Sequence, residues 1–325
     1  MKYIRVAILL LFILSLSLSA CSIHNSDMDT VSSLPISHSS TTTATTTVPS
    51  DPWNVMSYLG LEDIISISKV DDECESVETW CVRYQSDDCN VVSYLSIPEK
   101  CLSDRVPYSC VIFNRGGNQN LGYNTAQQIA GTAEMLNSVV FASDYRGTLS
   151  SSGQDEFGGN DLHDVLKLID FCEYFPFVDM DRLYMWGVSR GGMMTYMSIR
   201  QDDRIDKAIV VSGTANLFTG YNYREDMREN VLKRLIGGSP DELPEEYKKR
   251  SAVFWAEEFK CPVLFFHSKQ DPRVSYDEAA ELVKALDAAG KEYKFVSYDD
   301  DVHGLHPEDG QIIMEWCDFG PKIEN

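Results

Sequence analysis

The run LYMWGVSRGGMMTYM, from Leu183 to Met197, places strong limits on how this chain of 325 residues can fold. An apolar segment typical of a buried strand leads into GVSRG at 187–191, and a helix-like segment follows. In the Gly-x-Ser-x-Gly turn between a strand and a helix, the small residues let the two elements approach closely. The turn presents the serine near the helix N-terminus, where unpaired N–H groups favour negative charge. We therefore expect Ser189 to be a nucleophile.

Strand-like and helix-like segments alternate along most of the chain after residue 107. The strand-like segments, such as YSCVIFN, KAIVV and CPVLFFH, are almost wholly apolar, as expected of strands buried on both faces. Helical spacing occurs between them, for example at 161–175 and 276–289. The alternation predicts an α/β fold with a mostly parallel central sheet and helices on both faces. Residues 53–107 add short strand-like runs, and we expect the charged insert 216–260 to form helices over one end of the sheet.

A serine nucleophile needs a base, and the base needs an orienting carboxylate. Asp271 follows the strand-like run VLFFH, and His303 follows the next one, KFVSY. The order Ser, Asp, His, each just past a predicted strand, predicts a catalytic triad of Ser189, Asp271 and His303. His306 is the rival base, whereas we expect His267 to shape the acid loop and His163 to be structural.

An oxyanion hole requires two donors aimed at the oxygen of the tetrahedral intermediate. The backbone N–H of Arg190, the residue after the nucleophile, is the first candidate. The second is expected from the loop FNRGGN, within Arg115, Gly116 and Gly117, where glycines let the backbone come close to a substrate. The alternative is that the two glycines only form a tight turn.

The N-terminus has the pattern of an export signal. Lys2 and Arg5 precede an apolar run at 6–14, which is short for a membrane span of about 20 residues. The following LSAC, ending in Cys21, resembles the lipobox of bacterial lipoproteins, which implies cleavage before Cys21 and lipid attachment to its thiol. A true membrane anchor and an ordinary signal peptide are the alternatives. We expect an exported protein that is lipid-anchored to the outer face of the bacterial membrane.

These boundaries divide the chain into three parts. Residues 1–20 are the predicted signal peptide, the Ser- and Thr-rich residues 21–52 are a flexible linker, and residues 53–325 are the catalytic domain. The formal net charge of −22 argues against a nucleic-acid partner. No cofactor is expected, and the oligomeric state stays open.

Eight cysteines follow Cys21, and four of them lie within residues 74–101. An even number in an exported chain permits disulfides, so a local bridge in that region is plausible, although the pairing is left open. A zinc site is the alternative, but no Cys-x-x-Cys pair occurs and the spacings are irregular, so no metal is expected. The eight residues are Cys74, Cys81, Cys89, Cys101, Cys110, Cys172, Cys261 and Cys317.

Several runs over about residues 108–305 resemble, in order, the catalytic domain of the prolyl oligopeptidase family of α/β-hydrolases. They are FNRGGN, ASDYRGT, GGNDLHDVLKLIDF, WGVSRGGMMTY, RSAVFWAEEFKCPVLFFHSKQDPRVS and DDDVHGL. The resemblance implies an α/β-hydrolase fold, the triad Ser189, Asp271 and His303, and cleavage of an amide or ester through an acyl-enzyme.

Two departures from the family pattern affect the expected substrate. Many members carry a tyrosine directly before the glycines of the oxyanion loop, where this chain has Arg115. Either a backbone N–H acts as donor, or the guanidinium assists, or the substrate differs. Residues 53–107 are also too few for the β-propeller that filters substrates in the family's peptidases. A peptide is the first substrate class, a carboxylic ester is the alternative, and a non-catalytic binding protein of the same fold is the third possibility.

Overall fold

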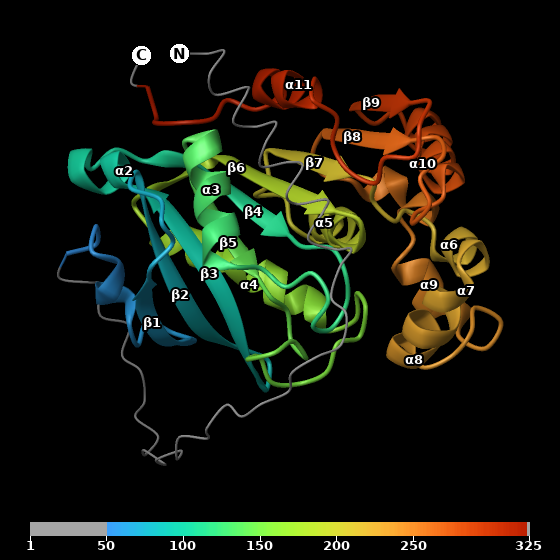
Figure 1. Ribbon diagram of the computed structural model, residues 1–325, viewed down its shortest axis with the longest axis horizontal. Coiled ribbons are helices and arrows are strands. Elements are labelled where there is room, and N and C mark those ends of the chain that lie inside the picture. Colours follow the sequence, from blue (N-terminus) through green and yellow to red (C-terminus); the bar gives the residue numbers. More distant parts are fainter. Residues whose placement is uncertain (1–50, 324–325) are drawn as a thin grey trace.

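The computed structural model describes residues 51–323 and is built around a nine-stranded sheet (Figure 1). The strand order across the sheet is β1-β2-β3-β5-β4-β6-β7-β8-β9. The strands are β1 (Ile64–Val70), β2 (Val77–Ser86), β3 (Cys89–Pro98), β4 (Tyr108–Asn114), β5 (Val139–Ser143), β6 (Val178–Val188), β7 (Lys207–Val211), β8 (Val263–Ser268) and β9 (Tyr293–Tyr298).

The type of strand pairing changes once across the sheet, at β5. Strands β1, β2, β3 and β5 pair antiparallel, whereas β5, β4, β6, β7, β8 and β9 are parallel neighbours. Antiparallel strands need only short turns, so residues 64–98 form a meander that extends one edge of the sheet. The mostly parallel sheet predicted from the sequence is therefore confirmed.

Helices cover both faces because alternate residues of each strand point to opposite sides. Cys110 and Ile112 of β4 lie in the core shared with α4 (Asp161–Tyr174), α5 (Arg190–Gln201) and α10 (Tyr276–Ala289). Val111 and Phe113 lie in the opposite core with α3 (Ala126–Leu136) and α11 (Asp309–Trp316). This two-sided burial explains why the strand segments are almost continuously apolar.

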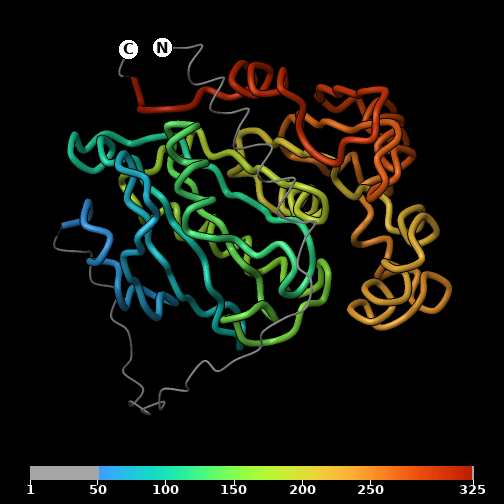
Figure 2. The backbone as a smooth tube through the Cα atoms, in the orientation of Figure 1, coloured from blue at the N-terminus to red at the C-terminus, as the bar shows by residue number. Residues whose placement is uncertain are grey.

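The insert after β7 is helical, as predicted. The edge meander and this insert lie at opposite ends of the molecule (Figure 2). Two short elements near the N-terminal edge, η1 (Val55–Tyr58) and α2 (Glu99–Asp104), flank the meander. The insert contains α6 (Leu217–Tyr223), α7 (Glu225–Met227), η2 (Arg228–Leu232), α8 (Lys233–Ile236), α9 (Pro244–Lys249), η3 (Ala252–Phe254) and η4 (Ala256–Glu258).

The predicted signal peptide, Cys21 and nearly all of the linker lie outside the described residues. Within residues 51–323, no helix combines the length and the hydropathy required to cross a bilayer. The plausible bridge among residues 74–101 was wrong for this structure, in which all eight described cysteines are free. Cys81 of β2 lies opposite Tyr94, and Cys101 is buried on α2, where its thiol donates to backbone carbonyls.

Arg146, in the loop after β5, joins separate parts of the fold through a buried ion pair. Its guanidinium donates to both carboxylate oxygens of Asp164 on α4, with the shortest contact at 2.7 Å. It also reaches Ser86 and Asp87 at the turn between β2 and β3. Burial raises the pKa of Asp164 despite this partner, so the charged carboxylate depends on Arg146. The pair therefore ties the edge meander to α4.

We expect Arg146→Ala to lower the free energy of unfolding by about 3–5 kcal/mol, because it leaves a carboxyl group buried without its cation. Arg83→Ala is the control, since the Arg83 guanidinium makes one exposed hydrogen bond, to the Ser150 carbonyl, and should cost about 1 kcal/mol or less. Urea unfolding followed by circular dichroism measures both. An equal loss of unfolding free energy in Arg146→Ala and Arg83→Ala would contradict the stabilising role of Arg146.

Candidate active site

The three predicted catalytic residues lie at one edge of the sheet, where parallel strands end. Ser189 follows β6, Asp271 lies in the loop after β8, and His303 lies in the loop after β9. Backbone hydrogen bonds join the last two loops, from Lys269 to Tyr298 and from Gln270 to Asp300. Ligands of open α/β sheets bind at this edge, so topology alone brings these distant residues together.

Ser189 occupies the strained turn that its flanking glycines predict. Its backbone has φ of 56° and ψ of −120°, in the left-handed half of conformational space that a side chain normally disfavours. The Ser189 N–H donates to Val211 on β7, and the carbonyl accepts from Gly192 and Thr214. Bonds on both sides hold the residue in this conformation.

The neighbouring glycines are required by close packing. A Cβ at Gly187 would lie 2.1 Å from the carbonyl oxygen of Gly191, and a Cβ at Gly191 would lie 1.9 Å from that of Asn114. Neither distance is compatible with a side chain. The start of α5 therefore presses against the ends of both β6 and β4, which is the close strand-to-helix approach predicted from the motif.

His303 and Asp271 form a direct pair. The Nδ1 atom of His303 lies 2.8 and 3.0 Å from the two carboxylate oxygens of Asp271. Backbone N–H groups of Arg273 and Val274 donate to the same carboxylate at 2.8 and 3.1 Å. Burial raises the pKa of Asp271, but the hydrogen bond and charge of His303 and the Arg273 N–H outweigh it, so this pKa lies below its usual range. The carboxylate stays ionised and orients the ring, which leaves Nε2 available as the base.

Ser189 and His303 do not form a hydrogen bond in this structure. Within residues 51–323, the Ser189 hydroxyl has no hydrogen-bond partner, and both side chains are only partly buried. Catalytic hydrogen bonds are often long or poorly aligned before substrate binds. The structure thus forms the acid–base pair, and the Ser189–His303 contact stays a prediction.

The loop after β4 lies directly against the predicted nucleophile. A Cβ placed on Gly116 would be 3.3 Å from Cβ of Ser189 and 3.1 Å from the carbonyl oxygen of Val188. Within the described part of the chain, the N–H groups of Gly116 and Gly117 donate to no protein acceptor. The N–H of Arg190 begins α5, where the first N–H groups have no partner inside the helix. These positions suit the donors of an oxyanion hole.

The guanidinium of Arg115 cannot serve as such a donor, which corrects the expectation that it assists in the oxyanion hole. The side chain is 2% exposed, and all of its nitrogens are occupied by the protein. They donate to the carbonyl oxygens of Gly116, Gln119, Leu121 and Asp144 and to the Thr148 hydroxyl. Arg115 therefore shapes the loop around its own carbonyls, and any oxyanion donor here is a backbone N–H.

The side chain of Arg190 has a structural role that the motif did not reveal. Its guanidinium is buried in ion pairs with Asp155, at 2.7 Å, and with Asp161 at the start of α4. The guanidinium carbons of Arg115 and Arg190 both lie over the ring of Tyr145, 4.9 and 5.1 Å from its centroid. Although Asp161 and Tyr145 stand within the quoted sequence runs, only the folded chain shows that they support the first turn of α5.

His306 has a carboxylate partner of its own, whereas His267 lies beside the acid, with its Nε2 3.5 Å from an Asp271 carboxylate oxygen. His306 bonds to Asp300 at 2.7 Å and stacks on Tyr298, so the rival base has its own carboxylate. His267 lies 3.0 Å from the carbonyl of Val274, which fits the expected role of shaping the acid loop. Burial lowers the pKa of His267, so it stays neutral.

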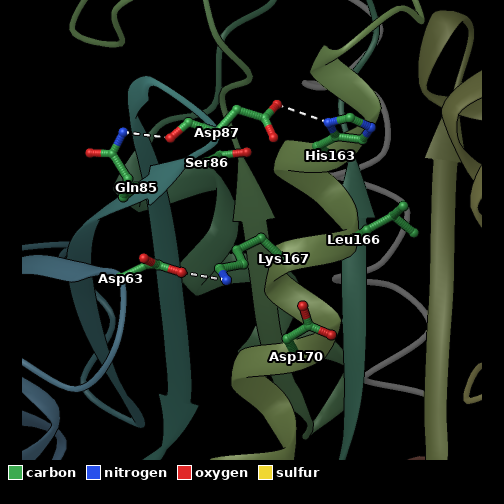
Figure 3. Close-up of a pocket in the computed structure, with 8 residues that line it drawn as sticks. All are labelled: Asp63, Gln85, Ser86, Asp87, His163, Leu166, Lys167 and Asp170. Carbon is green, nitrogen blue, oxygen red and sulfur yellow. Dashed lines mark hydrogen bonds and ion pairs between the residues drawn. The ribbon is translucent and has the colours of Figure 1, made fainter. Parts of the chain in front are cut away.

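A cavity of about 410 Å³ lies elsewhere, between the edge meander and α4 (Figure 3). It shares no residue with the candidate site, and the charges on its walls are already paired. His163, predicted to be structural, contacts Asp87 at 2.8 Å, and Lys167 pairs with Asp63. Among residues 51–323, no three His, Cys, Asp or Glu side chains gather closely enough to hold a metal ion.

The two candidate bases can be separated by matched substitutions. We expect His303→Gln to slow turnover of p-nitrophenyl acetate and labelling by a fluorophosphonate at least about 10³-fold, because no base remains for the serine proton. His306→Gln should keep rates within a few-fold of the parent. Melting temperatures verify that both variants are folded. Loss of activity in His306→Gln but not in His303→Gln would show that His306, and not His303, is the base.

Two comparisons by sequence match more than half of this chain. The model of the prolyl oligopeptidase family matches residues 123–316, more than half of the chain. The uncharacterized peptidase YtmA of Bacillus subtilis is 27% identical over 241 residues, which cover 74% of this chain and 91% of that protein.

Solved structures show the same fold. The acylaminoacyl peptidase of Pyrococcus horikoshii has a TM-score of 0.63 at 23% identity, over 75% of this chain and 42% of that one. An acetyl xylan esterase from Paenibacillus sp. R4 has a TM-score of 0.62 at 17% identity, over 77% of this chain and 87% of that one. This chain thus spans less than half of the acylaminoacyl peptidase it resembles. Through the family match and the shared fold, the chain belongs to the prolyl oligopeptidase family and is a serine hydrolase with the α/β-hydrolase fold.

Proposed function

We propose that this protein cleaves peptide bonds through an acyl-enzyme, with Ser189, Asp271 and His303 as its catalytic triad. The observation that carries the proposal is the pairing of His303 with a buried, ionised Asp271 at the sheet edge where Ser189 is presented. The family match and the relatives named peptidases support an amide as the substrate bond.

The chemistry follows from these positions. His303 Nε2 takes the proton of Ser189 as its oxygen attacks the carbonyl carbon, and Asp271 stabilises the imidazolium that forms. The Arg190 N–H, with an N–H from Gly116 or Gly117, donates to the oxygen that becomes negative. The protonated His303 then gives its proton to the leaving amine. Water, activated by the same histidine, hydrolyses the ester on Ser189 and restores the free enzyme.

A carboxylesterase is the second candidate, and the N-terminal part of the described chain favours it. Residues 64–98 form the meander that joins the central sheet, so they supply no separate domain to select peptide ends. An ester also requires less help for its leaving group than an amide. The same triad would perform both reactions.

A fluorophosphonate probe and matched substrates distinguish these functions. We expect the probe to label the parent protein, and Ser189→Ala to lose labelling and slow turnover at least about 10³-fold while the protein stays folded. Aminoacyl and prolyl p-nitroanilides should be cleaved with a higher kcat/KM than p-nitrophenyl acyl esters, once each is corrected for its uncatalysed rate. A preference for the esters would favour the esterase, and a folded protein with neither labelling nor turnover would indicate a binding protein.

We further propose that the chain is exported and lipid-anchored through Cys21. The support is the charged, apolar and small-residue pattern of residues 1–20, followed by the cysteine. A lipid on Cys21, followed by the Ser- and Thr-rich linker, would tether the catalytic domain outside the membrane.

The anchor is tested with the full chain expressed in a bacterium. We expect Cys21→Ala to stop incorporation of labelled palmitate and to leave the precursor uncleaved by lipoprotein signal peptidase. Cys74→Ala is the matched control and should behave as the parent. Equal labelling of Cys21→Ala and the parent would contradict the proposal.

A further inference from the structure

The insert of residues 216–260 is held firmly at its beginning. The Glu278 carboxylate of α10 accepts hydrogen bonds from the N–H groups of Ala215 and Asn216, both at 3.0 Å. The Asn216 side chain donates to Glu281 at 2.5 Å, and the Tyr223 hydroxyl donates to the carbonyl of Asp271 at 2.6 Å. The first residues of the insert are therefore joined to α10 and to the loop that holds Asp271.

The outer part of the insert, residues 224–236, is held differently. Its ion pairs are internal, between Arg224 and Asp226 and from Arg228 and Lys233 to Glu229. Within residues 51–323, one hydrogen bond connects this segment to the protein outside the insert, from Arg234 Nη2 to Gln119 Oε1 at 2.7 Å. Arg234 is exposed. A hydrogen bond in contact with water contributes little net stability, so it can break and re-form readily.

The order of strands in the sheet shows where the Arg234–Gln119 contact lies relative to Ser189. The strands run β4-β6-β7, so β6 lies between the strand that precedes Gln119 and the strand that precedes the insert. A segment that begins after β7 and touches the loop after β4 must cross the end of β6, where Ser189 lies. The helices of the insert form a group of their own at this end of the molecule (Figure 1).

Gln119 is itself fixed to the candidate site. Its N–H donates to Asp155 at 2.6 Å, and Asp155 pairs with Arg190 beside the nucleophile. Its carbonyl accepts from the buried guanidinium of Arg115, in the loop whose Gly116 adjoins Ser189. One side of the contact is therefore rigid. The other side belongs to a segment that is held by the burial of Val231 and Leu232 and by polar contacts within the insert.

We propose that Arg234 and Gln119 form a latch that holds residues 224–236 across the end of β6 at Ser189, which makes Arg234 a specificity-determining residue. The latched insert admits short substrates and restricts long peptides that must extend past it on both sides of Ser189. This inference rests on the proposed peptidase function for its substrates, although the latch can also be measured without turnover.

The kinetic experiment compares one scissile bond in a short anilide and in a long internally quenched peptide. We expect Arg234→Ala and Gln119→Ala each to raise kcat/KM for the long peptide about 3- to 10-fold, the range that one net hydrogen bond can shift an open–closed equilibrium. The short substrate should change less than twofold. The double variant should match either single variant, because both remove the same contact. Arg234→Lys should stay near the parent ratio, since an ammonium still donates to Gln119.

Lys233→Ala is the matched control, since it removes a neighbouring cation of α8 that pairs with Glu229 inside the insert. It should leave the ratio of long to short substrate unchanged. Additive effects of the two latch substitutions, or an unchanged ratio in both, would overturn the latch.

Amide hydrogen exchange gives a readout that needs no activity. Exchange in residues 224–236 should become several-fold faster in Arg234→Ala and Gln119→Ala, and not in Lys233→Ala. Unchanged exchange in the two latch variants would refute the proposal even if peptides are cleaved. Faster exchange in a protein that no fluorophosphonate labels would instead refute the proposed function and leave the latch standing.

Discussion

The close approach of α5 to the ends of β4 and β6 is the constraint on which the candidate site depends. A Cβ on Gly191 would lie 1.9 Å from the carbonyl oxygen of Asn114, so the helix begins in contact with the backbone of β4. That contact forces Ser189 into its left-handed conformation. It also brings the loop that follows β4 against the serine, so one packing requirement positions both the nucleophile and the N–H groups beside it.

Buried arginines support this arrangement in a protein whose net charge is −22. Arg115 satisfies backbone carbonyls, whereas Arg146 and Arg190 are paired with buried carboxylates. A guanidinium has five N–H donors in a fixed plane, so one side chain can hold several loop segments at once. Burial of such charges is costly unless they are paired and hydrogen-bonded. Arg190 has two carboxylate partners, although its Nε donor has no acceptor within residues 51–323. The loops behind Ser189 thus gain a defined shape from groups that take no part in proton transfer.

Two segments add to the parallel part of the sheet: the meander β1–β3 at one edge and the helical insert after β7. The meander β1–β3 extends the antiparallel edge and is secured to α4 by Arg146. The insert after β7 reaches the opposite side of the site and touches the loop that holds Gly116. The chain covers 91% of YtmA but 42% of the acylaminoacyl peptidase.

The sequence by itself determined the order of strands and helices, the turn at Ser189 and the loops that hold Asp271 and His303. These follow from local periodicity, from glycine spacing and from the rule that parallel strands end at one edge. Only the tertiary structure decided that the Arg115 guanidinium faces carbonyls, that Asp155 and Asp161 hold Arg190, and that the cysteines stay unbridged. Such contacts join residues far apart in the chain. Their partners depend on how loops pack in three dimensions, which no local pattern encodes.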